Sequence, residues 1–332
     1  MKAKRMPNEL EASWSEDDMV SGETVKAQVL IMRTNGCCWA KAGSGGCTMC
    51  GYRTASLSNV TEDDLNAQID QALSKYRGEP FVKIYTSGSF FDTNEIPVPV
   101  RERVFREYAS CRRILVESRP EFITDELVAT LPKNLTVALG LESSNEEVLR
   151  RCINKGFTAA QSREAGMRLK AAGIGVRTYL LLKPPFLSEN GGMEDAIASA
   201  RFADPFSDEI SINPLNIQHG TYVERLWKRG DFRSPWIWSL IEVMKTLSGT
   251  VNARLMSSPS GGGSQRGVHN CGKCDAAALS AVERFSFSQN PADLEVSCEC
   301  KLTWEQYLKA EKLLGTSADI GRALDSELTI KM

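Results

Sequence analysis

The chain has 332 residues, a net charge of -2 and 42% hydrophobic residues, which is ordinary for a globular protein and gives no overall attraction to nucleic acid. This length can bury the core of one large α/β barrel or of two smaller domains. No apolar run approaches the ~18 residues of a membrane span, and the first residues lack the apolar region of a secretory signal, so we expect a cytoplasmic protein without a membrane partner.

Apolar runs of strand length alternate with helical patterns after residue 22. We expect strands over residues 25–33, 81–86, 113–118, 135–142, 176–182 and 209–215. Helix start signals at Thr61, Ser144 and Thr158 lie between these runs, and Gly173 marks a helix end. Six β–α units in series predict an α/β fold, a partial (β/α)6 TIM-like barrel with its site at the carboxyl ends of the strands.

The alternation weakens near residue 218, which divides the chain into three predicted parts. Residues 1–22 form an N-terminal extension, residues 23–220 the partial barrel, and residues 221–332 C-terminal helices with a small cysteine-rich, metal-binding module. Within the last part, residues 221–230, 236–249 and about 303–314 have helical patterns, and residues 257–267 form a glycine- and serine-rich loop.

The first cysteine group follows the first predicted strand. Cys37 and Cys38, then Cys47 and Cys50, lie in a loop in which Gly43, Gly45 and Gly46 allow the chain to curl back. Clustered cysteines in a reducing compartment indicate metal binding rather than disulfides. Three thiolates on a four-iron cluster leave one iron that a small molecule can chelate.

A structural zinc site is the alternative for this loop. Zinc prefers four ligands in two close pairs, which here requires both Cys37 and Cys38. Adjacent side chains point apart, so the spacing favours the iron–sulfur interpretation. Whether Cys37 or Cys38 is the third ligand stays open from the spacing alone.

The RTNGC and GGCTMCGY runs around these cysteines resemble radical S-adenosylmethionine (SAM) enzymes of tRNA modification. The archaeosine-forming type within the Elongator-like family is the nearest pattern, and the resemblance covers residues 25–305. Nine residues separate Cys37 from Cys47, longer than the commonest spacing of the superfamily but typical of this subfamily. The resemblance implies a radical SAM barrel and a [4Fe-4S] cluster on Cys37, Cys47 and Cys50.

Polar residues end several of the predicted strands. Ser87, Gly88 and Ser89 follow the second strand, Glu117 and Arg119 project from one face at the end of the third, and Glu142 ends the fourth. In the family the ends of the second and third strands contact SAM, so the resemblance assigns the first five residues to SAM binding. Glu142 joins them because successive strands all end in polar residues at the same rim. Each ending alone is also compatible with an ordinary turn, a surface ion pair or a local cap.

The resemblance also implies a reaction. SAM chelates the open iron, and one electron from a reductant splits it to a radical that takes hydrogen from the substrate. In the archaeosine type the substrate is tRNA with a lysine adduct on the deazaguanine at position 15. The enzyme is a lyase that breaks the lysine carbon–nitrogen bond, and a lysine-adding transferase is the expected partner. No catalytic side chain is assigned.

The second cysteine group consists of two close pairs. Cys271 with Cys274, and Cys298 with Cys300, offer four thiolates that suit a structural zinc ion, and His269 can replace one of them. A second iron–sulfur cluster is the alternative, because four cysteines suit both. Cys111 and Cys152 stand alone and are expected to be small buried residues.

Residues 225–238 interleave basic and aromatic residues. Such a stripe either contacts RNA or buries its aromatic side in the core, and Arg266 is a second candidate for RNA contact. A non-catalytic, zinc-stabilised RNA-binding subunit and an Elongator-like radical SAM tRNA-modifying enzyme are the alternatives to the lyase.

Overall fold

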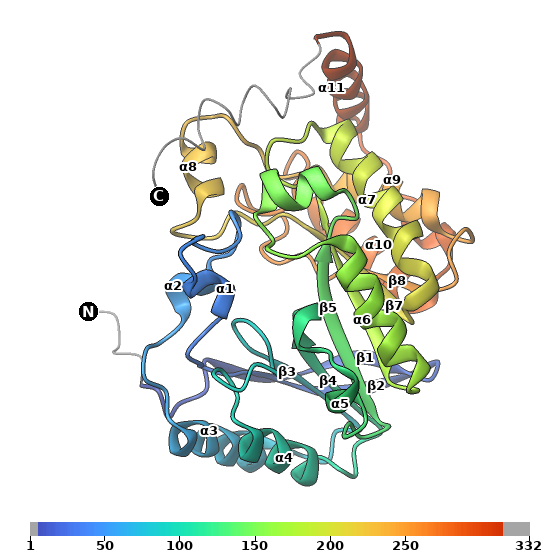
Figure 1. The fold of residues 1–332 in the computed structure, drawn as a ribbon. Coiled ribbons are helices and arrows are strands. Elements are labelled where there is room, and N and C mark those ends of the chain that lie inside the picture. The colour runs from blue at the N-terminus through green and yellow to red at the C-terminus, as the bar shows by residue number, and fades with distance from the viewer. Residues whose placement is uncertain (1–5, 315–332) are drawn as a thin grey trace. The chain divides into compact units, whose positions relative to one another are not determined.

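The computed structural model describes residues 6–314 of the chain (Figure 1). The strands are β1 (Ala12–Val20), β2 (Glu23–Ile31), β3 (Phe81–Tyr85), β4 (Arg113–Ser118), β5 (Leu135–Glu142), β6 (Gly175–Leu182), β7 (Glu209–Pro214) and β8 (Arg254–Met256). The α-helices are α1 (Cys38–Lys41), α2 (Tyr52–Ala55), α3 (Glu62–Lys75), α4 (Val98–Glu107), α5 (Asp125–Val128), α6 (Ala159–Ala171), α7 (Glu189–Ala203), α8 (Tyr222–Lys228), α9 (Ile237–Leu247), α10 (Asp275–Ser288) and α11 (Cys300–Leu314). Short turns of other pitch are η1 (Pro120–Phe122), η2 (Val148–Ile153), η3 (Asp204–Phe206) and η4 (Pro291–Leu294).

The strands follow one another in the sheet in chain order. β1 pairs antiparallel with β2, whereas β2 to β5 pair in parallel and β7 pairs in parallel with β8. Parallel neighbours joined by helices are the predicted α/β arrangement, because such strands require a crossover connection. The predicted start at Thr61 is also confirmed, since its side chain forms a capping box with Asp64.

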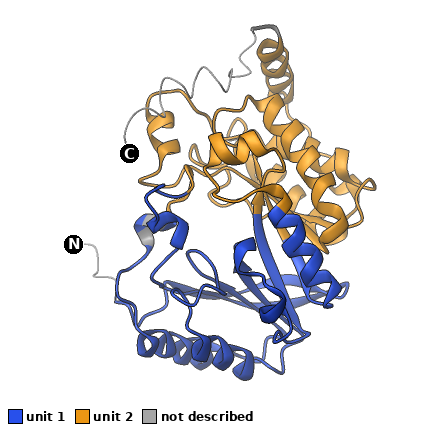
Figure 2. Cartoon of the chain, viewed as in Figure 1, with its two compact units in different colours: residues 1–46, 52–140, 161–177 blue, residues 47–51, 141–160, 178–332 orange. Residues whose placement is uncertain are grey.

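The chain divides into two compact units (Figure 2). Unit 1 comprises residues 1–46, 52–140 and 161–177, and unit 2 comprises residues 47–51, 141–160 and 178–332. The predicted domain boundaries near residues 22 and 220 stay a prediction. In the described residues, no helix has both the length and the apolar character needed to cross a membrane.

Unit 1 is built on β1 to β4 with α3 and α4 packed beside each other. Leu65 and Ile69 of α3 and Val100 and Val104 of α4 are buried in the same apolar core as Ile84 of β3. The four-residue spacing places each helical pair on one face, so both helices present an apolar stripe to the sheet.

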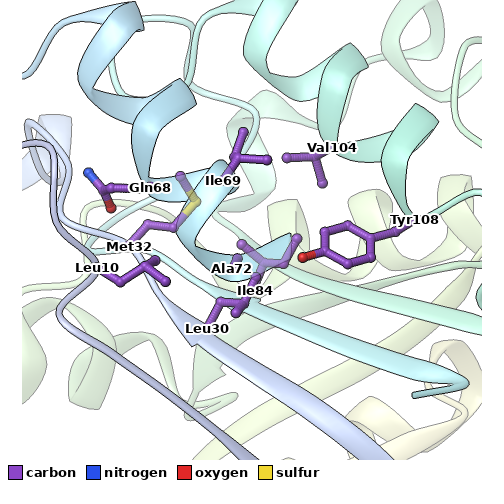
Figure 3. Close-up of a pocket in the computed structure, with 9 residues that line it drawn as sticks. All are labelled: Leu10, Leu30, Met32, Gln68, Ile69, Ala72, Ile84, Val104 and Tyr108. Carbon is purple, nitrogen blue, oxygen red and sulfur yellow. The ribbon is translucent and has the colours of Figure 1, made fainter. Parts of the chain in front are cut away.

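A small cavity remains in this core (Figure 3). The space open to a water-sized sphere is about 10 Å³, near the minimum that holds one water. Its polar neighbour Gln68 is already engaged, because its amide donates to the carbonyls of Pro7 and Arg33 and accepts from the Arg33 N–H. The cavity is therefore a packing defect and too small for a substrate.

Unit 2 contains a helical core formed by α7, α9 and α10. Leu240, Val243 and Met244 of α9 are fully buried, and Phe285 of α10 belongs to the same core. Trp304 of α11 is also buried, and its indole N–H donates to Ser239 Oγ at 2.9 Å. This bond ties the C-terminal helix to α9, so the cysteine-rich region is part of a packed unit.

Two strands were not among the six predicted from the sequence. β1 lies in the predicted N-terminal extension, and its sequence, ASWSEDDMV, carries three acidic residues. β8 has only three residues, below the length that a periodic pattern can reveal. Both are edge strands that depend on a neighbour for pairing rather than on their own apolar pattern.

Buried charge explains why the acidic β1 joins the sheet. Asp18 is 2% exposed and forms ion pairs with Lys83 of β3 and, at 3.4 Å, with Arg177 of β6. Burial alone raises the pKa of Asp18, but Arg177 and Lys83 outweigh it and hold the pKa at about 2. Glu16 accepts a further bond from Lys83 at 2.7 Å.

We expect Asp18→Asn to destabilise the protein by about 3–5 kcal/mol, because two buried cations lose their counterion. The matched control is Asp17→Asn, since Asp17 is 51% exposed and, among the described residues, pairs with the exposed Lys26 alone. Because the folded-state pKa of Asp18 is lowered, its contribution is present above pH 4 and is lost as pH falls toward 2. Denaturant unfolding of both variants at pH 7 measures the difference, and equal stability of the two contradicts this account.

Candidate functional site

The first cysteine loop is shared between the two units. Cys37 directly precedes α1 and belongs to unit 1, and Cys38 is the first residue of α1. Cys47 and Cys50 belong to unit 2, where the Cys50 N–H donates to the Cys47 carbonyl at 3.2 Å. All four side chains are half-buried. Their assignment as cluster ligands stays a prediction from the sequence pattern.

Thr48 fixes the loop between Cys47 and Cys50. Its N–H donates to the Ile153 carbonyl at 2.9 Å, and its hydroxyl donates to the Cys152 carbonyl at 2.6 Å. Both carbonyls end η2, a π-helical turn, and such turns often occur at functional sites. The Thr48 carbonyl in turn accepts from the Tyr222 N–H at 3.0 Å, at the start of α8.

Gly51 follows this loop and has no room for a side chain. Its N–H donates to Gln218 Oε1 at 2.5 Å. A Cβ at this position would lie 2.7 Å from Gln218 Oε1 and 2.8 Å from Gln218 Cβ. The Cys47–Gly51 segment is therefore held to the rest of unit 2 at Thr48 and Gly51, which gives Cys47 and Cys50 a defined position within unit 2.

Glu95 organises the corresponding part of unit 1. Its carboxylate is 1% exposed and accepts from the Thr34 hydroxyl at 2.6 Å and from the Ser87 and Ser89 N–H groups at 3.0 and 2.7 Å. Burial raises the pKa of Glu95, while these three donors act in the opposite direction. Glu95 thus joins the segment that leads to Cys37 with the loop that follows β3. Sequence reasoning did not identify this residue, because only its distant partners distinguish it.

Gly88 lies where these two segments meet. A Cβ on Gly88 would approach Cys37 Cα to 2.5 Å and Glu95 Oε2 to 2.4 Å, so only glycine fits. Ser89 is buried, and its hydroxyl is within 2.8 Å of Ser118 Oγ, so it is already engaged by a neighbouring strand end. The neighbouring Thr86 hydroxyl is buried and, within the described residues, has no hydrogen-bond partner.

Arg119 follows the end of β4 and is buried against aromatic and acidic neighbours. Arg119 is 7% exposed, forms an ion pair with Glu121 and lies over the Trp39 ring, with its guanidinium carbon 5.7 Å from the ring centre. Glu117 contributes its backbone carbonyl, which accepts from the Phe90 N–H at 2.8 Å. The predicted roles of Glu117 and Arg119 in SAM binding stay predictions.

Glu142 ends β5 in a strained backbone conformation. Its φ is +69°, in the left-handed region that non-glycine residues rarely adopt. Its carboxylate accepts from the Lys155 ammonium at 2.8 Å, and both side chains are largely buried. Lys155 follows η2 and also lies over the Phe157 ring, 5.5 Å from its centre. The Lys155–Glu142 pair depends on the fold of residues 141–160, which brings the end of β5 next to the residue after Asn154.

The C-terminal cysteines form a compact group in unit 2. The Sγ atom of Cys271 lies 3.8 Å from the Sγ atom of Cys274 and 3.8 Å from that of Cys298. The Sγ atoms of Cys274 and Cys300 are 3.6 Å apart. All four sulfurs lie within 4.8 Å of one another. Four sulfurs at about 2.3 Å from one tetrahedral zinc ion would be about 3.8 Å apart, so the spacing fits a single ion. A four-iron cluster separates its thiolates further, because each binds a different iron.

Two neighbouring side chains support this sulfur group. The Trp238 indole N–H donates to Cys300 Sγ at 3.3 Å, and the Asn270 amide donates to Cys274 Sγ at 3.5 Å. Donors around metal-bound sulfur orient the ligands and reduce their negative charge. His269 lies outside the group, and its Nδ1 is 2.8 Å from the Gly267 carbonyl.

Asp195 of α7 is a buried carboxylate that sequence reasoning also missed. Its Oδ1 accepts from the Ser143 hydroxyl at 2.8 Å, just after β5. Its Oδ2 is buried and has no hydrogen-bond partner among the described residues. Burial raises the pKa of Asp195 to about 6, although the Ser143 bond acts in the opposite direction.

This environment predicts a pH-dependent effect of Asp195→Asn. Because the folded-state pKa of Asp195 is raised, its ionisation costs stability as pH rises from 4 to 6, on the order of 2–3 kcal/mol above pH 6. The asparagine variant should therefore melt several degrees higher than the wild type at pH 7 and lose this advantage near pH 4. The control is Glu194→Gln, at the exposed neighbouring position. A constant difference in melting temperature between the two pH values contradicts the raised pKa.

No protein-family model matches the chain. The solved structure of a methylornithine synthase matches 68% of this chain and 63% of its own, with a TM-score of 0.50 and 16% identity. This likeness concerns the fold alone. Together with the strand order and the four-cysteine group, it confirms the predicted α/β fold class.

Curated relatives match over nearly their whole length. The archaeosine synthase subunit beta of Methanosarcina acetivorans is 42% identical over 94% of this chain and 93% of its own. The protein of the same name from Thermococcus kodakarensis is 39% identical over 88% of this chain and 94% of its own. These matches confirm the family resemblance of the RTNGC and GGCTMCGY runs, and the chain belongs to the archaeosine synthase subunit beta family.

Proposed function

We propose that this protein is a radical SAM enzyme that acts on tRNA in the formation of archaeosine. The observation that carries the proposal is the near full-length match to archaeosine synthase beta subunits, combined with the Cys37, Cys47 and Cys50 pattern. The relatives are named as beta subunits, which supports a second subunit as a partner of this protein. We place the reaction in the cytoplasm, with a one-electron reductant as a further partner.

The finer proposal concerns the bond that is broken. The substrate is tRNA carrying a lysine adduct on the deazaguanine at position 15, and the enzyme acts as a lyase on the lysine carbon–nitrogen bond. The partner is then the transferase that adds lysine. This assignment rests on the resemblance of the cysteine loop to the archaeosine type.

Cys37, Cys47 and Cys50 are the proposed thiolate ligands of a [4Fe-4S] cluster. When bound, the cluster and SAM supply the one-electron chemistry that removes a hydrogen atom from the substrate. Thr48 holds the segment between Cys47 and Cys50, and Glu95 holds the segment that leads to Cys37. These contacts fit ligands that must keep their positions while the substrate enters and leaves.

The proposed SAM contacts are the residues at the strand ends: Ser87, Gly88, Ser89, Glu117, Arg119 and Glu142. Two observations within unit 1 support the proposed SAM-binding role of the loop after β3. The missing side chain of Gly88 allows close approach of the backbone to the Cys37 segment, and the buried Thr86 hydroxyl has no protein partner among residues 6–314. An unpaired buried hydroxyl is costly unless a ligand or water satisfies it.

We also propose that Cys271, Cys274, Cys298 and Cys300 bind one structural zinc ion. Sulfur spacings of 3.6–3.8 Å support a single tetrahedral ion. The site joins the loop before α10 to the start of α11. Trp304, four residues after Cys300 in α11, is buried in the core of unit 2. Its role is then to fix the C-terminal helix in unit 2.

The function is tested by anaerobic reconstitution of the full chain with iron and sulfide. Wild-type protein should hold about four irons, release 5′-deoxyadenosine from SAM and convert the lysine-modified tRNA nucleoside, as read by nucleoside mass spectrometry. Cys47→Ala should lose most of the iron and all of the deoxyadenosine, whereas the control Cys111→Ser should keep both, since Cys111 is a buried residue of the unit 1 core. A wild-type protein that holds only zinc would falsify the proposal.

The C-terminal group is tested separately. We expect one zinc per chain in anaerobically purified protein, and Cys298→Ser should lower both the zinc content and the melting temperature, because three thiolates bind zinc more weakly than four. Iron bound after reconstitution should not change in this variant. If Cys298→Ser instead removes about half of the iron, the site holds a second iron–sulfur cluster.

A further inference from the structure

The outer side of α8 concentrates positive charge on a chain whose net charge is -2. Arg225, Lys228 and Arg229 are exposed and are spaced three and four residues apart, so they lie on one side of the helix. Arg266, from the loop before α10, is 36% exposed and forms an ion pair with Glu224 of α8. We call these four residues the α8 basic face.

Two members of this face stack on aromatic rings. The guanidinium carbons of Arg225 and Arg266 lie 4.9 Å from the ring centres of Tyr222 and Trp227, respectively. Stacking fixes the plane of each guanidinium without using its N–H donors. Arg266 uses part of its edge within the protein, because its Nε donates to the Ile217 carbonyl and its Nη2 to Glu224. The predicted stripe over residues 225–238 has two parts in the structure. Its basic residues at the start are exposed, whereas Phe232 and Trp238 are buried in the core.

Nearby carboxylates reduce this positive charge but do not cancel it. Glu224 is 7% exposed and also lies 3.5 Å from Lys228, and Asp231 pairs with Arg229 at 3.0 Å. Among the contacts described for residues 6–314, these four cations meet the two carboxylates of Glu224 and Asp231. His219, 85% exposed and 3.2 Å from Glu224, lies on the same side. The face is consequently a local basic patch, which an RNA-binding protein of low net charge requires.

The α8 basic face begins at the proposed cluster loop. The Tyr222 N–H, at the first residue of α8, donates to the carbonyl of Thr48 between Cys47 and Cys50. Tyr222 is the first residue of a seven-residue helix about 10 Å long, so the backbone that carries Arg225 and Lys228 starts at this contact. A few nucleotides of RNA span this length. A nucleotide that reaches the proposed cluster therefore has neighbouring phosphates within reach of the face.

We propose that the α8 basic face binds the phosphate backbone of the RNA substrate next to the nucleotide that reacts. This inference rests on the proposed function, and it adds the surface that holds the substrate. Phosphate contacts of this kind position an RNA without reading its sequence. The large exposed hydrophobic side chains of the described residues lie elsewhere in the chain, so the face has the character of a polyanion site rather than of an apolar protein interface.

The test is a titration of full-length protein with a labelled tRNA transcript at several salt concentrations, which does not depend on turnover. Replacing Arg225, Lys228 and Arg229 together by alanine should weaken binding roughly tenfold or more and reduce the slope of log affinity against log salt by about one for each lost contact. The matched control replaces three exposed basic residues of the same unit, Arg284, Lys309 and Lys312, by alanine and should bind like wild type.

Iron content and deoxyadenosine release without tRNA should stay at the wild-type level in the α8 variant. If the proposed function is wrong, wild-type protein lacks the iron or releases no deoxyadenosine. If only the RNA-binding role of the α8 basic face is wrong, those two results stand and the tRNA titration alone shows no change. If the triple variant does not fold, the double variant Arg225→Gln, Lys228→Gln replaces it and must show the same direction of change.

Two results overturn the proposal. The first is an unchanged affinity and salt dependence in the α8 variant, or an equal loss in the control. The second is an unchanged tRNA affinity together with lost binding of the purified partner subunit, which makes the face a protein interface.

Discussion

The contacts of Thr48 are the constraint on which the rest of unit 2 depends. One residue uses its N–H and its hydroxyl to satisfy two carbonyls at the end of η2, and its carbonyl to accept from the first N–H of α8. Backbone groups at helix ends lack partners within the helix, so each of these bonds satisfies a group that would otherwise be unpaired. The same three bonds position the proposed ligands Cys47 and Cys50 on one side and the α8 basic face on the other.

Glu95 has the equivalent role in unit 1, at a larger electrostatic cost. Removing a carboxylate from water is unfavourable unless hydrogen bonds replace its hydration. Thr34, Ser87 and Ser89 supply three donors, and hydrogen bonds to a charged acceptor are stronger than neutral ones. The cost of burial is offset only while the two loops keep their positions. A carboxylate is thus better suited than an apolar residue to hold two polar backbone segments together.

Features that depend on residues close together in the chain could be predicted from the sequence. Strand-length apolar runs gave most of the parallel strands, and the pairs Cys271–Cys274 and Cys298–Cys300 gave the four-sulfur group. The missed features depend on residues far apart in the chain. Asp18 of the acidic edge strand β1 is buried beside its partners Lys83 and Arg177, and Glu95 is distinguished only by its three donors. No local pattern reports such partners, so neither element could be predicted from its own segment.

The two cysteine groups differ in the way their ligands are fixed, and this difference fits their proposed roles. The C-terminal sulfurs lie within 4.8 Å of one another, and Trp238 and Asn270 donate to two of them, which suits a closed site without an open coordination position. The first group instead consists of cysteines in a glycine-rich loop, where Thr48 fixes the backbone between Cys47 and Cys50 and Glu95 accepts from the Thr34 hydroxyl, three residues before Cys37. Three thiolates on a four-iron cluster leave one iron for a small molecule to bind. Under the proposed roles, the anchored loop suits a cluster that takes part in chemistry, and the closed four-sulfur group suits a structural ion.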